Sequence, residues 1–300
     1  MPTPLLRGGV SADEPVNTPL RPAQESKTHP YPSQEGNRAA RCFYVRFFHL
    51  FAVLMSIAAG LQAQHAHFIT SGTIEFERKT NVWNMIKREI NKDNDAVLVP
   101  ALENYKKTSP QFRVLKSTLS FSDDKTLFTP IEADPPTNNL FSAAPLMTQN
   151  NTIYSDLSNG LTISPKKIFD DAFLVKDSTR KIKWKITDET RDIAGYHCRR
   201  ANGIMLDSVY IVAFYTTQIP VPGGPESFNG LPGMILGVAL PHENITWFAT
   251  KVTGNQLPPN TVAPPKKGKP TDSKGFRATL QTLVKDQGPI AADFVRQFLL

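Results

Sequence analysis

The chain has 300 residues, with 34 Lys and Arg against 27 Asp and Glu, and a formal net charge of +7. This excess is mild, and the basic side chains are scattered apart from one cluster at Lys266, Lys267 and Lys269, so nucleic-acid binding is not predicted. The chain shows no repeat of 20 to 50 residues and no strand-helix-strand rhythm, which argues against a solenoid and against a Rossmann or barrel enzyme.

The first 40 residues are rich in Pro, Ser, Gln and Asn and poor in large apolar side chains. Such a segment cannot bury enough surface to fold, so residues 1–40 are expected to be a disordered extension or the product of a start codon assigned too early. Residues 41–63 carry two arginines, then an apolar run, and end in small residues. They predict a secretory signal peptide that is cleaved after Ala63.

A membrane anchor is the alternative interpretation of this run. The uncharged part is shorter than the roughly 20 residues that a helix needs to cross a bilayer. We therefore expect no stable transmembrane span after cleavage, and an exported protein that is periplasmic, associated with the outer membrane, or secreted.

The mature chain shows mostly β patterns. Residues 73–78 alternate apolar and charged side chains, and residues 112–121 and 125–131 are two strand candidates around a turn-prone Ser-Asp-Asp. Residues 152–157 and 173–175 continue the series. A helix is predicted over residues 97–107, with another turn or two before it.

The second half alternates more clearly. Residues 181–187 place Ile182, Trp184 and Ile186 on one face of a strand, and residues 196–200 return after a turn. On the returning strand Cys198 shares a face with Tyr196 and is predicted to be buried. No internal disulfide is possible, because Cys198 is the only cysteine after cleavage.

An apolar run at 209–215 predicts a central strand, and a Pro- and Gly-rich stretch, residues 219–238, follows it. The end of this stretch enters a strand at 234–240, and another strand is predicted at 245–252. Residues 231–234 are suited to a type II turn.

The expected fold is mainly β: a single antiparallel meander sheet, curved or half-barrel-like, with a few short helices. Residues 64–256 form this domain, and residues 257–300 a Pro- and Lys-rich arm followed by short helices.

Several ordered motifs resemble the GLPGLI family of exported proteins from Bacteroidetes. The resemblance covers most of residues 70–280, and Met234 stands where the family hexapeptide has Leu. It implies an exported protein of unknown biochemical role and transfers no catalytic residue. The residues of the hexapeptide are Gly230, Leu231, Pro232, Gly233, Met234 and Ile235.

Known catalytic and metal motifs are missing from the sequence. There is no Gly-x-Ser-x-Gly, no phosphate loop and no His-Glu-x-x-His, and paired aspartates in a strand would point to opposite faces. We predict neither a metal site nor a cofactor.

Two functions from different classes remain. The first is a non-catalytic envelope protein whose curved sheet binds an apolar or peptide ligand, or an outer-membrane protein. The alternative is a hydrolase or thiol enzyme that uses Cys198 with His197 or His242, although consecutive strand residues point apart. The residues predicted to bind in the first case are Tyr210, Phe214, Tyr215, Phe228, Leu231, Pro232, Met234 and Trp247.

Overall fold

The computed structural model describes residues 47–49, 68–131, 151–168, 170–206, 208–285 and 290–299. The chain divides into two units, Met1–His65 and Ala66–Leu300. The predicted extension at 1–40 lies outside the described residues, and so does the predicted signal peptide at 41–63, except for an exposed helical turn at 47–49. Within the described part of the chain, no helix combines the length and the apolar character needed to cross a bilayer.

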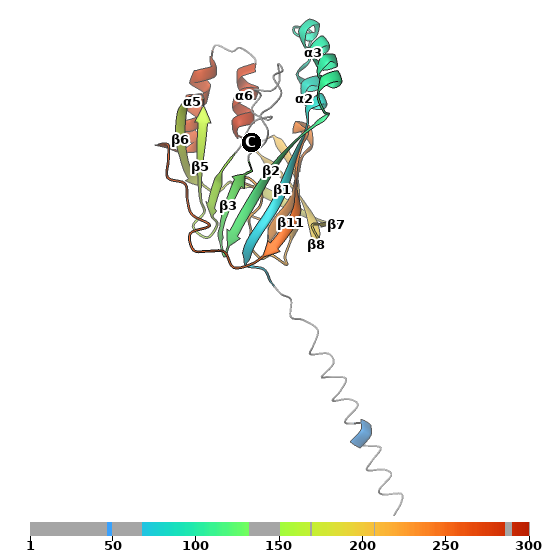
Figure 1. Cartoon of the computed structure of the whole chain (residues 1–300), viewed down its shortest axis with the longest axis vertical. Coiled ribbons are helices and arrows are strands. Elements are labelled where there is room, and N and C mark those ends of the chain that lie inside the picture. The colour runs from blue at the N-terminus through green and yellow to red at the C-terminus, as the bar shows by residue number, and fades with distance from the viewer. Residues whose placement is uncertain are drawn as a thin grey trace, which may run out of the picture. The chain divides into compact units, whose positions relative to one another are not determined.

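The second unit is built on one twelve-stranded sheet, which is not closed (Figure 1). The strands lie in the order β12-β6-β5-β4-β3-β2-β1-β11-β10-β9-β8-β7, so two meanders meet where β1 pairs with β11. Their bounds are β1 Ser71–Asn81, β2 Phe112–Ser122, β3 Lys125–Pro130, β4 Ile153–Asp156, β5 Leu161–Ile168, β6 Asp171–Ser178, β7 Lys183–Ile193, β8 Tyr196–Met205, β9 Val209–Thr216, β10 Met234–Leu240, β11 Ile245–Gly254 and β12 Lys269–Thr271.

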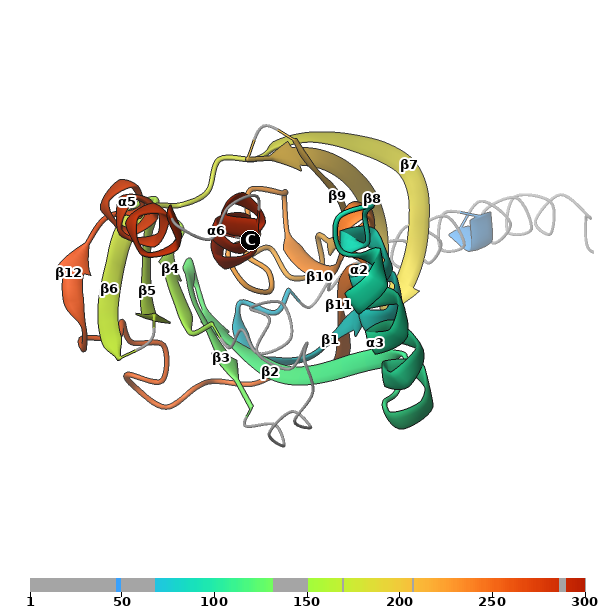
Figure 2. The ribbon, with the colours of Figure 1, turned by 90° about the horizontal axis from the view of Figure 1, so that it is seen from above.

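Short helices pack against this sheet. Figure 2 shows α6 inside the curve of the sheet and α5 beside β6. The Asn81 side chain caps α2, and the Asp272 side chain caps α5 by accepting a hydrogen bond from the Gly275 N–H. The helices are α2 Val82–Glu89, α3 Asp95–Thr108, the 3₁₀ turn η1 Pro241–Glu243, α5 Ser273–Val284 and α6 Ile290–Leu299.

The mainly β class is confirmed, but the prediction of a purely antiparallel sheet is wrong. β12 pairs with β6 in parallel, with Lys269 opposite Phe173, which makes the sheet mixed. The long connection from β11 to β12 carries the chain from the middle of the sheet to its edge, as the order of the strands requires. Pro270 cannot donate a hydrogen bond to a second neighbour, and an edge strand is where a sheet tolerates proline.

The turn at residues 231–234 also differs from its prediction. The Gly233 N–H donates to the Leu231 carbonyl at 2.8 Å, while the Met234 N–H donates to the Ile219 carbonyl at 2.9 Å across the base of the loop. The structure therefore has a tight turn around Pro232 instead of the type II turn. Gly233 has a φ of 151°, and a Cβ there would lie 2.1 Å from the Thr216 carbonyl oxygen. Only glycine fits this close approach.

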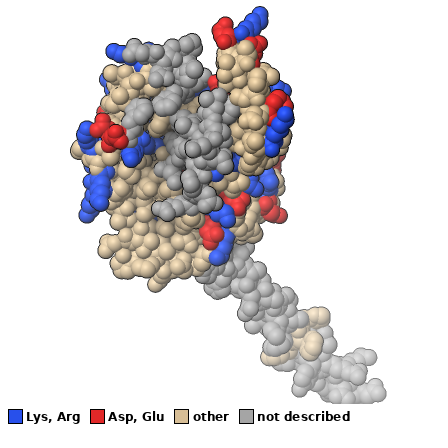
Figure 3. Space-filling view, turned by 45° about the horizontal axis from the view of Figure 1, so that its top comes forward, with Lys and Arg blue, Asp and Glu red and all other residues tan. Residues whose placement is uncertain are grey.

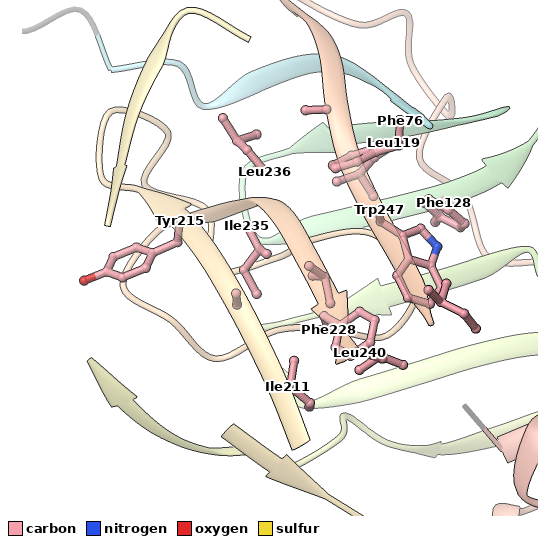
Figure 4. Packing of buried hydrophobic residues seen from close by; sticks show 14 of the residues in the cluster. Phe76, Leu119, Phe128, Ile211, Tyr215, Phe228, Ile235, Leu236, Leu240 and Trp247 are labelled. Carbon is pink, nitrogen blue, oxygen red and sulfur yellow. The ribbon is translucent and has the colours of Figure 1, made fainter. Parts of the chain in front are cut away.

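The main core lies along the centre of the sheet and includes the Pro- and Gly-rich loop. In Figure 4, Phe228 from this loop packs near Trp247 of β11, and their ring centroids are 5.7 Å apart. A second buried cluster joins Ile168 of β5 to Phe276 and Leu280 of α5 and to Val295 of α6. This second cluster attaches the C-terminal helices to the β5 and β6 end of the sheet.

Candidate functional site

A cavity of about 450 Å³ lies between this end of the sheet and the C-terminal helices. Its volume is within the range of roughly 300 to 1,000 Å³ that small-molecule sites occupy. β4, β5 and β6 line one side of it, α5 and α6 line another, and the Pro- and Gly-rich loop reaches it through Ser227.

Strand alternation decides which side chains reach the cavity. Thr162, Ser164 and Lys166 are successive even positions of β5, and all three line it. On β6, Val175 and Asp177 lie two residues apart and also line the cavity. Val175 lies opposite Ser164, and Asp177 lies opposite Thr162. The sheet thus presents a mixed patch of hydroxyl, amine, carboxylate and aliphatic groups to the interior.

Cationic side chains outnumber carboxylates around the cavity. Asp177 is its one carboxylate among the described lining residues. Asp177 already has partners, because its Oδ2 accepts from the Ser273 N–H at 3.0 Å and its Oδ1 from the Ser178 N–H at 2.7 Å. Hydrogen bonds from Ser273, and then from Ser178, hold the pKa of Asp177 below its ordinary value. The cations of the lining are Lys166, Arg180, Lys181 and Arg277.

Lys166, which is half-buried, ends a chain of hydrogen bonds whose other members, Asn151 and Glu226, are buried. Its ammonium group donates to Asn151 Oδ1 at 2.5 Å, and Asn151 Nδ2 donates to Glu226 Oε2 at 2.8 Å. Burial lowers the pKa of Lys166 to about 8, which attraction to Glu226 opposes and repulsion from Arg180 and Arg78 reinforces. Lys166 is therefore a cation held at a desolvated position, and its described hydrogen-bond partner is a neutral amide.

Arg180 lies between β6 and β7 and joins the cavity to α6. Its Nη1 lies 2.9 Å from the Met205 sulfur, and its Nη2 donates to the Leu299 carbonyl at 2.8 Å. Both partners are neutral. Burial lowers the pKa of Arg180, and attraction to Glu226 opposes this.

A third cation, Arg78 of β1, lies deeper behind Asn151. Arg78 is 5% exposed, and its guanidinium carbon lies 5.4 Å from the centroid of the Trp247 ring. Arg78, Asn151, Trp247 and Glu226 line a small void of about 10 Å³. Burial lowers the pKa of Arg78, and attraction to Glu226 opposes this. Three cations thus interact with the single carboxylate of Glu226.

Apolar groups make up much of the remaining lining. Phe276 of α5 stacks edge-on against Phe173 of β6, with centroids 5.7 Å apart. The cavity is therefore amphiphilic, because aliphatic and aromatic surfaces adjoin the amine and guanidinium groups. The apolar side chains are Ile153, Val175, Leu206, Phe276, Phe298 and Leu299.

A buried carboxylate fastens α6 over this cavity. Glu243 of η1 is 2% exposed and accepts hydrogen bonds from Arg296 of α6 and, at 2.9 Å, from Arg88 of α2. Two helices from opposite ends of the unit's sequence are thereby fixed to the end of β10.

The structure does not bring the predicted binding residues to this cavity. Pro232 is exposed, and Tyr210 and Phe214 are half-buried. None of the eight predicted residues is among the side chains that line the cavity. The other five lie in the main core, several of them visible in Figure 4: Tyr215, Phe228, Leu231, Met234 and Trp247.

Cys198 is completely buried, and its Sγ lies 3.4 Å from the Tyr196 carbonyl oxygen. Burial, with a contribution from Asp192, raises the pKa of this thiol to about 12. His197 is exposed and pairs with Asp192 at 3.1 Å, while His242 packs against the ring of Tyr210. Among the described residues, no group of three His, Cys, Asp or Glu side chains is placed to hold a metal ion.

Sequence reasoning missed the residues that form the polar part of the cavity. Glu226 stands out in the sequence as the one carboxylate of the Pro- and Gly-rich stretch, and this was the available signal. Lys166 lies on a strand that was not predicted, because Pro165 and two lysines interrupt its pattern. Asn151 and Arg180 lie outside regular elements and carried no signal.

The surface outside the cavity does not show a single sign of charge. In the view of Figure 3, Lys and Arg alternate with Asp and Glu over the described residues. The described residues on this face form no extended cationic stripe of the kind that follows a nucleic-acid backbone.

Comparison with known families finds one match. A family model described as a protein of unknown function (Porph_ging) matches residues 203–237. This short stretch runs from β8 through β9 and the Pro- and Gly-rich loop into β10. No curated protein matches the chain.

Solved structures show distant likenesses. The chain is similar to PNGF-II in a P21 crystal form, at 17% identity and a TM-score of 0.44 over 70% of this chain and 32% of that one. PNGF-II in a C2 crystal form gives 17% identity and a TM-score of 0.43 over 69% of this chain and 32% of that one. An uncharacterized conserved protein from Thermus thermophilus gives 6% identity and a TM-score of 0.35 over 72% and 99% of the two chains. The chain thus spans 32% of the length of the PNGF-II chains that it matches.

Proposed function

We propose that this protein is an exported, non-catalytic binding protein of the cell envelope that holds a small amphiphilic molecule in its cavity. The observation that carries this proposal is the cavity of about 450 Å³, in which cationic and apolar side chains adjoin. A cleft or cavity with a mostly apolar lining and a few polar groups is the usual form of a small-molecule site.

The state of Cys198 supports binding over thiol chemistry. The thiolate is the reactive form of cysteine, and a pKa of about 12 leaves almost none of it at neutral pH. The sulfur is buried, and His197 lies on the exposed face of the same strand.

Export and family membership are part of the same proposal. The signal-like segment at 41–63 supports export to the periplasm, the outer membrane or the medium. The hexapeptide Gly230–Ile235 supports membership of the GLPGLI family, and the match at 203–237 to a family of unknown function overlaps this motif.

Native mass spectrometry of protein purified from the periplasm tests the proposal. We expect a bound small molecule that denaturation releases, and a chain mass that corresponds to cleavage after Ala63. Thr162→Trp would fill the cavity from β5 and is expected to abolish the bound species.

Thr190→Trp is the matched control, because Thr190 is exposed on β7 and does not line the cavity. It is expected to leave the bound species unchanged. Protein that reproducibly carries nothing, or a Thr162→Trp variant that carries as much as the Thr190→Trp variant, would contradict a ligand in this cavity.

A further inference from the structure

We propose that Lys166 and Arg180 form a carboxylate-binding subsite, and that the ligand of the cavity is an amphiphile with an anionic carboxylate head. This inference rests on the proposed binding function and adds the charge and the chemical class of the ligand.

The first step is the charge around the subsite. Lys166 and Arg180 line the same cavity, and among the described residues both are attracted to one carboxylate, that of Glu226. Asp177 keeps its negative charge, but it does not contribute to the pKa shift of Lys166 or of Arg180, and its oxygens accept hydrogen bonds from the backbone of Ser273 and Ser178. A ligand anion would complete the balance in a region that water screens poorly.

The second step is the donor capacity of the two side chains. An ammonium group has three N–H donors, and the one described bond of Lys166 goes to the Asn151 amide oxygen. The guanidinium of Arg180 bonds to the Met205 sulfur and the Leu299 carbonyl, which are neutral acceptors. Donors of this kind form their strongest hydrogen bonds with an ionised acceptor such as a carboxylate.

The third step separates a carboxylate from a phosphate. Phosphate sites typically use the free N–H groups at a helix N-terminus. The helix that begins at this cavity is α5, and the carboxylate of Asp177 already accepts from its first N–H, that of Ser273. A side chain has thus taken the position that a phosphate would occupy, and Lys166 and Arg180 remain for a smaller, singly charged head.

The fourth step places the rest of the ligand. Ile153 and Val175 from the sheet, and Phe276 and Phe298 from the helices, line the same cavity. These side chains provide an apolar surface that an alkyl or aryl tail would cover. A small hydrophilic anion would leave this surface uncovered.

Calorimetric titration of delipidated protein tests the inference, with decanoate, decanol and decyl phosphate as probes. Decanoate is expected to bind the wild type at least tenfold more tightly than decanol. Lys166→Met is expected to weaken decanoate at least tenfold while leaving decanol unchanged. Lys166→Arg, which keeps the charge, is expected to remain within a few fold of the wild type.

Lys167→Met is the matched control, because Lys167 is the next residue of β5, is exposed, and does not line the cavity. It should bind decanoate as the wild type does. Equal weakening by Lys166→Met and Lys167→Met, or tighter binding of decanol or decyl phosphate than of decanoate, would overturn the carboxylate subsite. These results would leave the cavity proposal standing, since the Thr162→Trp comparison decides that proposal separately.

Discussion

At Lys166 the requirements of folding and of binding oppose each other. Burial lowers the pKa of its ammonium group from 10.5 to about 8. The folded chain therefore holds this proton less tightly than the unfolded chain does. Below pH 8 Lys166 is protonated in both states, and its charge destabilises the folded state by the full amount. Between pH 8 and 10.5 Lys166 loses its proton first in the folded state, and this destabilisation diminishes.

Lys166→Met is accordingly expected to raise the free energy of unfolding of the ligand-free protein at pH 7. The expected gain is about 1 to 3 kcal/mol. Removing the charge raises the stability by about 1.4 kcal/mol for each unit by which the pKa is lowered. The loss of the hydrogen bond to Asn151 offsets part of this gain. The gain should shrink as the pH rises from 8 to 10.5. Urea unfolding of both proteins at pH 7 and pH 10 measures this difference.

Lys167→Met serves again as the control and is expected to change the free energy of unfolding by less than about 0.5 kcal/mol. A Lys166→Met variant that is less stable than the wild type at pH 7 would contradict the proposed destabilisation by this half-buried charge.

Residue-level prediction from sequence succeeds where a local rule decides the outcome. The strand period alone predicts that Cys198 is buried while His197 is exposed, and the structure agrees. No local rule predicts the electrostatic interactions of Lys166 with Arg180 and Glu226, because these side chains come from segments that only the complete sheet and loop bring together.

Among the elements, α6 depends on Glu243 for its position. Arg296 of α6 and Arg88 of α2 both bond to this buried carboxylate. Glu243→Gln removes the charge and leaves both guanidinium groups without an ionised partner at that position. Local opening of α6 and α2 is expected to become easier by about 1 to 3 kcal/mol. Hydrogen exchange followed by mass spectrometry should show faster exchange in peptides from both helices.

Glu75→Gln provides the comparison for this variant. Glu75 forms an exposed pair with Lys251 at 3.6 Å, and such surface pairs contribute little to stability. Exchange in α2 and α6 should stay as in the wild type. Unchanged exchange in the Glu243→Gln variant would show that apolar packing alone fixes α6.

Element prediction from sequence depends on how regular each pattern is. Both strands beside the Pro- and Gly-rich loop, β9 and β10, were predicted from their apolar runs, and the helix α3 from apolar residues spaced at i, i+4 and i+7. β5 was missed because Pro165 lies within it, and β12 because three residues with a central proline carry no strand pattern. The parallel pairing of β12 depends on the path of the arm, which composition does not determine.

At the scale of the whole molecule, an open sheet has two edges that could pair with other chains. β12 limits one edge to three residues, and Pro270 removes a donor there. β7 forms the other edge, where Lys183 and Lys185 are exposed and the register with β8 shifts after Ile186. Short edge strands, lysines and bulges are known protections against edge-to-edge pairing.

Replacing Lys183 and Lys185 with Val is therefore expected to promote association of copies through β7. Sedimentation velocity over a range of concentrations should show larger species than the wild type forms. The double variant Lys116→Val with Lys251→Val loses the same charge, but its strands β2 and β11 already pair on both sides. It should sediment as the wild type does, and equal association of the two double variants would contradict protection of the edge.

The position of the cavity in the chain sets an order of assembly. One side of it comes from β4 to β6 and the other from α5 and α6, while β7 to β11 are synthesised between them. The helices reach their places only after the arm has followed the sheet to β12. The proposed ligand could therefore be enclosed only by the complete chain, and under the proposed function the protein takes up its ligand after synthesis has ended.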